Sequence, residues 1–168
     1  MDYKARVFYS LLSLAVLTAS ADARAAVSHF YGGTQVIAGT GYLYADGVAT
    51  DAAGNLYVVG TFDGHNGAGG TTDFKPGPGA DARTPVGYDA YVSKHGPDGT
   101  YGWTAVFSSA APDYVRIDAV AADGSGVYVT GLFSGSADFG PGAGGRVLQS
   151  VGGPNRFVAK LTPAGATA

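Results

Sequence analysis

An internal repeat constrains the fold of this 168-residue chain more than any other feature. Three stretches recur in the same order: LYVVGTF (56–62) as VYVTGLF (127–133), TDFKPG (72–77) as ADFGPG (137–142), and DAYVSK (89–94) as NRFVAK (155–160). The spacing between the copies changes only in loops, chiefly where the first copy carries an insertion at residues 65–70. Because packing fixes the spacing within strands while loops accept insertions, the repeat predicts two copies of one structural unit.

The composition predicts that this unit is built from β-strands. The chain holds 28 Gly and 8 Pro, and its 13 acidic residues are all Asp. Gly, Pro and Asp favour turns, whereas Tyr, Phe, Val and Thr favour strands. Apolar runs between turn residues predict strands at 46–50, 56–62, 90–95 and 101–107 in the first copy, and at 117–122, 127–133 and 157–161 in the second. We therefore expect an all-β fold of antiparallel four-stranded sheets, with the fourth strand of the second copy missing.

One of the predicted strands is apolar on both faces. Leu56, Val58 and Phe62 alternate with Tyr57 and Val59 along it. A strand of this kind is typical of a sheet packed between two neighbouring sheets.

A segment near the N-terminus is a candidate for the missing fourth strand. Val27–Gly33 precedes the first copy as Trp103–Ser109 precedes the second. We expect Val27–Gly33 to complete the sheet formed by residues 117–161, either within the chain or across a subunit boundary.

Four motifs of the first copy occur together: VATDAAGNLYVVGTF (48–62), DF-x-PGPG (73–79), GYDAYVSK (87–94) and PDGTYGW (97–103). Together they resemble the bacterial secreted β-propeller repeat family, also called SBBP repeats, over nearly all of Val27–Gly165. The resemblance implies a partial β-propeller of two four-stranded antiparallel blade-like sheets, on the surface of a cell or secreted from it. It also implies that the repeat itself carries no catalytic residues.

The first 25 residues are expected to be a cleaved secretory signal peptide. Lys4 and Arg6 precede an apolar run from Val7 to Ala19, and small residues with two A-x-A patterns follow. An N-terminal membrane anchor is the alternative, but this run is shorter than the roughly 20 residues needed to span a bilayer. The remaining chain is predicted to comprise the N-terminal strand with the first blade at 26–110 and the second, incomplete blade at 111–168, with no membrane span.

Two blades are too few to close a propeller, which usually needs about four to eight. Apolar faces and strand edges are therefore left without partners, and without cysteines no disulfide can compensate. The chain is expected to be a fragment of a larger propeller, to assemble with copies of itself into a ring, or to remain an open two-sheet unit. The expected partners are thus further propeller blades or other copies of the chain, with an extracellular glycan or protein as a further possibility.

Two loop motifs and one tryptophan are the candidate ligand-facing residues. Asp73 with Phe74, and Asp138 with Phe139, pair a carboxylate with an aromatic ring, a combination that can hold a sugar. The alternative is an apolar plug beside a turn that the Asp stabilises. Trp103 is a further candidate sugar-facing aromatic residue, together with Tyr91 in the lectin hypothesis below.

Catalytic and cofactor chemistry is not predicted. The DAAGN stretch at 51–55 lacks the ligand pattern of an EF-hand and is interpreted as a hairpin turn. Ser93 and His95 share a strand face without an acid nearby, so a hydrolase is not indicated. A net charge of −3 spread over turns does not favour nucleic-acid binding. The sequence predicts a structural or protein-interaction module that is not an enzyme, with a carbohydrate-binding lectin made of oligomerising chains as the alternative.

Overall fold

The computed structural model describes residues 33–63, 70–140 and 145–168, and this part of the chain is entirely β-strand, turn and loop. Paired strands run antiparallel in every sheet. None of these residues forms a helix long and apolar enough to cross a membrane. The predicted signal peptide at 1–25 and all of Val27–Gly33 except Gly33 lie outside the described residues.

Twelve strands are described in three sheets. Their bounds are β1 (Ala38–Gly39), β2 (Tyr42–Thr50), β3 (Leu56–Asp63), β4 (Thr72–Asp73), β5 (Ala82–Arg83), β6 (Tyr88–His95), β7 (Tyr101–Ser109), β8 (Val115–Asp123), β9 (Gly126–Phe133), β10 (Ser136–Asp138), β11 (Val147–Gln149) and β12 (Asn155–Leu161). The sheet orders are β1-β4-β5, β11-β10-β7-β6-β3-β2 and β12-β9-β8. All seven strands expected from the sequence are present.

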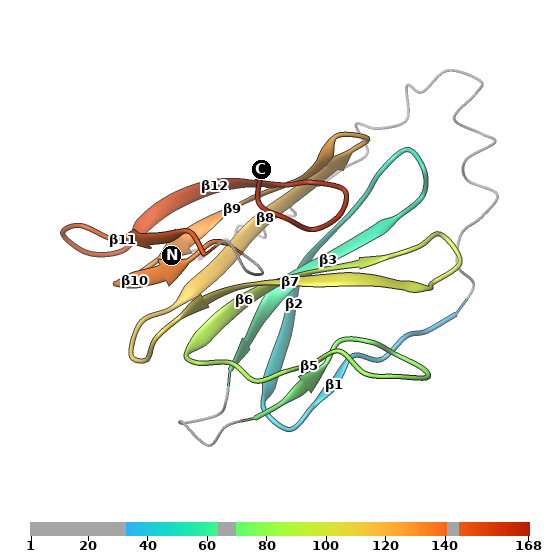
Figure 1. Ribbon diagram of the computed structural model, residues 1–168, viewed down its shortest axis with the longest axis horizontal. Helices are drawn as coiled ribbons and strands as arrows, with labels where there is room; N and C mark the ends of the chain where they lie inside the picture. The colour runs from blue at the N-terminus through green and yellow to red at the C-terminus, as the bar shows by residue number, and fades with distance from the viewer. Residues whose placement is uncertain (1–32, 64–69, 141–144) are drawn as a thin grey trace, which may run out of the picture.

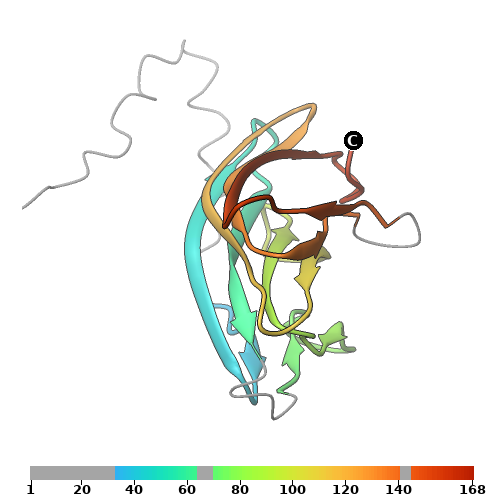
Figure 2. The same ribbon diagram turned by 90° about the vertical axis from the view of Figure 1, so that its left-hand side faces the viewer.

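The repeat appears as two equivalent groups of antiparallel strands. Unit 1 consists of β2, β3, β6 and β7, and unit 2 consists of β8, β9 and β12. Unit 1 lies between unit 2 on one side and the small β1-β4-β5 sheet on the other (Figures 1 and 2). Units 1 and 2 contact each other through their first strands, β2 and β8, and through β3 and β6 against β8.

The expectation of two four-stranded sheets needs correction, because the sheets contain six, three and three strands. A short hairpin within each repeat accounts for the difference. In the second repeat, β10 and β11 form this hairpin, and β10 also pairs with β7 of unit 1, so that sheet grows from four strands to six. In the first repeat, β4 and β5 form the equivalent hairpin, and β4 pairs with β1.

The pairing of β1 identifies which residues correspond to β7. Ala38 and Gly39 pair with β4, and Ser108 and Ser109 pair in the equivalent way with β10. This match gives an offset of 70, at which YGGTQV (31–36) corresponds to YGWTAV (101–106). Residues 33–39 therefore stand where β7 would stand in a unit preceding unit 1. The assignment of Val27–Gly33 to this role was out of register by six positions.

Unit 1 has two apolar faces, as the sequence predicts. Tyr57 and Val59 point toward unit 2 and join the larger core cluster with Val127 and Val129. Phe62 belongs to a second cluster on the opposite face, with Phe74 and Tyr91 at its centre and Ile37, Leu43, Val58, Tyr101 and Val106 around it. We call this opposite face the groove face of unit 1, after the groove on it that is described below.

A glycine allows each unit to pack closely at one point. A Cβ on Gly60 would lie 1.8 Å from the carbonyl oxygen of Tyr44, and a Cβ on Gly131 would lie 1.9 Å from that of Arg116. Both glycines face a β-bulge in the first strand of their unit. The invariant spacing of this glycine in the two copies thus reflects a steric requirement of the strand pairing.

Candidate functional site

The DF motifs close two equivalent hairpin loops. Asp73 Oδ1 accepts hydrogen bonds from the backbone N–H groups of Lys75 and Asp81 at 3.0 and 2.9 Å. In the second repeat, Asp138 Oδ1 accepts from the N–H groups of Gly140 and Arg146 at 2.8 and 2.7 Å. The backbone hydrogen bonds, first that of Lys75, lower the pKa of Asp73. Each carboxylate is thus occupied in holding the two sides of its own loop together.

The phenylalanines of the same motifs are core residues. Phe74 is 0% exposed and Phe139 is 3% exposed. Phe74 lies 5.2 Å from Phe62 and 4.8 Å from Tyr91 between ring centroids, and the equivalent distances from Phe139 to Phe133 and Phe157 are 5.2 and 4.7 Å. In this arrangement Phe74, Phe139 and the equally buried Tyr91 pack against other aromatic rings instead of standing exposed in a loop.

Trp103 is the candidate that lies at a surface hollow. Its indole N–H donates to the carbonyl of Pro163 at 3.0 Å, and its ring lies 6.2 Å from that of Tyr57. A hollow of about 300 Å³ is lined by Trp103 with Arg83, Thr104 and the turn at 164–166. The five predicted residues are therefore not brought together, because the two DF loops and Trp103 have separate surroundings.

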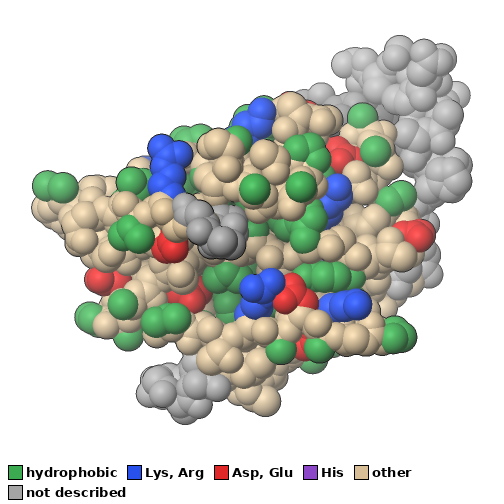
Figure 3. Space-filling model, in the orientation of Figure 1, with side chains coloured by type: hydrophobic (Ala, Val, Ile, Leu, Met, Phe, Trp, Pro, Cys, Tyr) green, Lys and Arg blue, Asp and Glu red, His purple; other side chains and the backbone are tan. Residues whose placement is uncertain are grey.

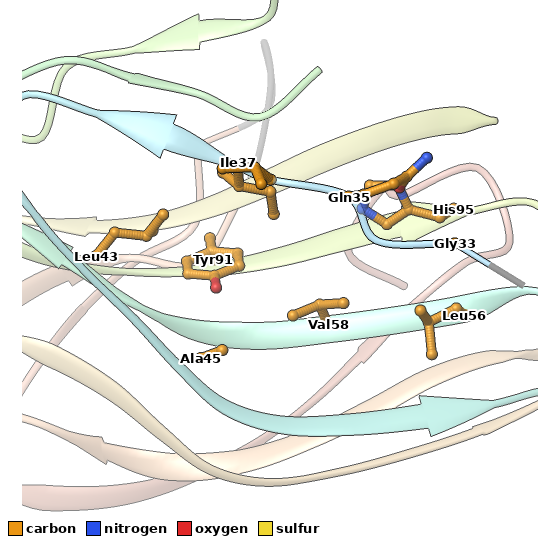
Figure 4. A pocket seen from close by; sticks show the side chains of 10 residues that line it. Gly33, Gln35, Ile37, Leu43, Ala45, Leu56, Val58, Tyr91 and His95 are labelled. Carbon is orange, nitrogen blue, oxygen red and sulfur yellow. The ribbon is translucent and has the colours of Figure 1, made fainter. Parts of the chain in front are cut away.

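A larger cavity lies on the groove face of unit 1. This groove of about 440 Å³ is bounded by the segment 33–37 on one side and by β2, β3 and β6 on the other. Figure 4 shows the segment that carries Gly33, Gln35 and Ile37 running beside the strands that carry Leu56, Val58 and Tyr91. Sequence reasoning did not assign a site here, although the apolar alternation of residues 56–62 predicts the face that forms its floor.

A chain of polar groups is buried beside this groove. His95 Nε2 and Ser93 Oγ are 3.1 Å apart, Thr104 Oγ1 donates to Ser93 Oγ at 3.1 Å, and Tyr101 OH donates to Thr104 Oγ1 at 3.0 Å. Burial lowers the pKa of His95, and its Nδ1 has no partner among the described residues. Ser93 is fully buried, and no carboxylate of the described residues contacts His95 Nδ1, so within this part of the chain the pair lacks the access and the acid that a serine hydrolase needs.

The carboxylate of Asp51, in the turn at residues 51–55, accepts its hydrogen bonds from residues of this turn and of the strand after it. Asp51 accepts hydrogen bonds from the N–H groups of Ala53 and Asn55, the Asn55 side chain and the Tyr57 hydroxyl, at 2.8 to 3.0 Å. The described residues contain no group of three His, Cys, Asp or Glu side chains that could hold a metal ion. The turn interpretation of residues 51–55 agrees with this geometry.

Two surfaces carry exposed apolar side chains whose counterparts in the other unit are covered. On the groove face, Val48 is 65% exposed, whereas its counterpart Val120 packs against the core. On the outer face of unit 2, Val158 is 78% exposed, whereas its counterpart Val92 is 0% exposed. Figure 3 shows apolar, acidic and basic side chains interspersed over one side of the molecule, with no field of one charge.

No family model, curated protein or solved structure matches the chain. What the chain can do must therefore follow from its own geometry.

Proposed function

We propose that the chain is a β-propeller segment whose two units are blades, and that it serves as a structural or protein-interaction module that stacks with further blades. Those blades lie on a longer propeller or on other copies of the chain. The module is secreted or displayed at a cell surface, in keeping with the resemblance to SBBP repeats and with the predicted signal peptide. It is not an enzyme under this proposal.

One observation carries the proposal: unit 1 is apolar on both faces, but only one of them is covered by another unit. The covered face buries Tyr57, Val59, Ala90 and Val92 against unit 2. The other face is covered only in part, by Phe74 and Ile37 of the neighbouring segments; it leaves Val48 exposed and holds the groove of about 440 Å³. Exposed apolar patches of this kind mark interaction surfaces, and a terminal unit of a repeat array normally presents a polar outer face instead.

Light scattering of the mature protein over a range of concentrations tests this proposal. We expect wild-type protein to self-associate and the Val48→Asp variant to remain a monomer, because a buried unpaired carboxylate opposes association. Val86→Asp is the matched control, since Val86 is 69% exposed but lies in the loop before β6. A wild-type protein that stays a folded monomer at every concentration would contradict the proposal.

The hollow at Trp103 favours a second candidate function, that of a carbohydrate-binding lectin made of oligomerising chains. Trp103 and Arg83 line it together, and an aromatic residue beside a charged residue is a combination that a sugar site uses. A glycan array is the test: binding by wild type that is lost in Trp103→Ala and kept in Val86→Ala would support the lectin. Absence of binding by a folded oligomer would contradict it.

A further inference from the structure

Residues 33–39 hold the same place against unit 1 that β7 holds against unit 2. Both segments pair with the hairpin of the following repeat in the same register. Both also pack an apolar side chain onto an aromatic cluster. Phe107 lies 5.3 and 6.0 Å from Phe139 and Phe157, and Ile37 packs against the equivalent cluster of Phe62, Phe74 and Tyr91.

Segment 33–39 nevertheless lacks the neighbour that β7 has. β7 pairs with β6 along most of its length, whereas residues 33–37 have no strand partner among the described residues and only Ala38 and Gly39 are paired, with β4. Among the described residues, it is therefore an outer strand without the neighbour that β6 provides for β7.

The outer edge of β12 in unit 2 is open over most of its length among the described residues. β12 pairs with β9 over its whole length, but on its other edge the described residues provide only a short pairing at the end of the strand, where Leu161 bridges Thr167 and the N–H of Ala168 donates to the carbonyl of Lys160. The turn that follows β12 has the same hydrogen bond as the turn that follows β6 in unit 1. The N–H of Thr162 donates to the carbonyl of Ala166, and the N–H of Gly96 donates to the carbonyl of Thr100. The edge at residues 156–159 thus offers open backbone groups, which readily recruit another strand.

We infer that segment 33–39 of one copy pairs with β12 of a second copy and completes unit 2 of that copy as its fourth strand. This inference rests on the proposed function and specifies its partner as the same chain. Within one molecule the pairing is excluded, because unit 1 stands between segment 33–39 and unit 2 (Figures 1 and 2).

The contact between units 1 and 2 provides the template for this interface. Repeating it between two copies places the outer face of one unit 2 on the groove face of the next unit 1. Val158 then takes the position of the buried Val92, and Val48 takes that of Val120, so both exposed valines are covered by one head-to-tail contact. Contacts of this heterologous kind lead to a ring or a filament.

The pairing of β6 with β7 predicts the register. Ser93 pairs with Thr104 in unit 1, so Ala159 of one copy is expected to pair with Thr34 of the other. In the same way, the pairing of Val92 with Ala105 predicts that Val158 pairs with Gln35. Directly opposed residues of antiparallel strands have Cα atoms about 4.5 to 5.5 Å apart, which is within the range that a disulfide can bridge.

Cysteine cross-linking tests this register directly, because the natural chain contains no cysteine. Two variants, Thr34→Cys and Ala159→Cys, are prepared separately, mixed and oxidised under mild conditions. We expect a disulfide-linked dimer in most of the mixed protein and little in either variant alone. The control is Thr34→Cys mixed with Val158→Cys, because the side chain at position 158 points to the other face of the strand. We expect at least about tenfold less dimer from this mixture than from Thr34→Cys with Ala159→Cys.

The outcomes separate this inference from the proposed function. Self-association that Val48→Asp abolishes, without the mixed disulfide, overturns the strand pairing and leaves the proposed stacking intact. A dimer formed equally by the control mixture also overturns the register. A folded wild-type monomer with no cross-linking in any mixture overturns both.

Discussion

Val92 and Val158 occupy the same position in the third strands of the two units, yet Val92 is 0% exposed and Val158 is 78% exposed. The strand pairing is the same at both sites, since Val92 lies opposite Val59 and Val158 lies opposite Thr130. The difference is that unit 2 covers Val92 and no described residue covers Val158. Val158 is therefore the position that a unit stacked on unit 2 would cover, as unit 2 covers Val92.

Val158→Asp is predicted to weaken self-association by at least about tenfold, because covering an unpaired carboxylate costs more than the roughly 1–3 kcal/mol of a neutral polar group, and about 1.4 kcal/mol already corresponds to tenfold in affinity. Sedimentation of the variant at several concentrations measures this effect. Val151→Asp is the control, since Val151 is 80% exposed but lies in the loop before β12. Equal weakening by both substitutions would show that added negative charge, not this face, controls association.

Gly60→Ala and Gly131→Ala are each predicted to lower the free energy of unfolding by several kcal/mol or to prevent folding. In both, the added methyl group would meet a backbone carbonyl at less than 2 Å, which the neighbouring strand cannot relieve by a side-chain rotation. Urea unfolding measures the loss. Gly124→Ala should change stability little, because nothing lies within 4 Å of its Cβ; a comparable loss there would refute the steric explanation.

Phe74→Ala and Phe139→Ala are predicted to destabilise the protein by about 3–5 kcal/mol each, as is usual for a buried phenylalanine. Each ring fills the centre of an aromatic cluster, so truncation leaves a cavity. Phe→Leu at the same positions should recover much of the loss. Urea unfolding of the four variants provides the measurement, and unchanged stability with lost ligand binding would instead identify the rings as part of a site.

The sequence predicted the long strands well because their period is visible in it. The alternation of Leu56, Tyr57, Val58 and Val59 defines two apolar faces, and the structure buries Tyr57 and Val59 against unit 2. The short strands β4, β5, β10 and β11 were missed, since two or three residues within Gly- and Pro-rich segments show no period. Their pairing depends on contacts with other strands.

The candidate site was harder to predict than the fold. A Phe in a loop can point to solvent or into the core with the same sequence, and only the packing of Phe74 beside Phe62 and Tyr91 decides between the two. The counterpart of β7 was misplaced because Ala38 and Gly39 have little strand propensity. Their register became evident only through their pairing with Asp73 and Thr72.

His95→Leu is predicted to remove part of the acid sensitivity of the fold. Burial lowers the pKa of His95 below its usual value of 6.5, so the folded protein keeps the ring neutral while the unfolded chain takes up a proton near pH 6.5. Its contribution to stability is therefore complete above about pH 6.5 and is lost as the pH falls toward the folded-state pKa. Leu161, the buried counterpart in unit 2, shows that this position accepts leucine.

Urea unfolding of wild type and His95→Leu at about pH 7.5 and about pH 5 measures this difference. We expect the wild-type free energy of unfolding to fall more than that of the variant between the two pH values. Burial also raises the pKa of Asp89. The effect of Asp89 on stability therefore has the opposite sign to that of His95, because it destabilises the fold as the pH rises above the usual pKa range of an Asp. This carboxyl is present in both proteins, so it cancels from the comparison. Parallel pH profiles would show that His95 is protonated equally in the folded and unfolded states.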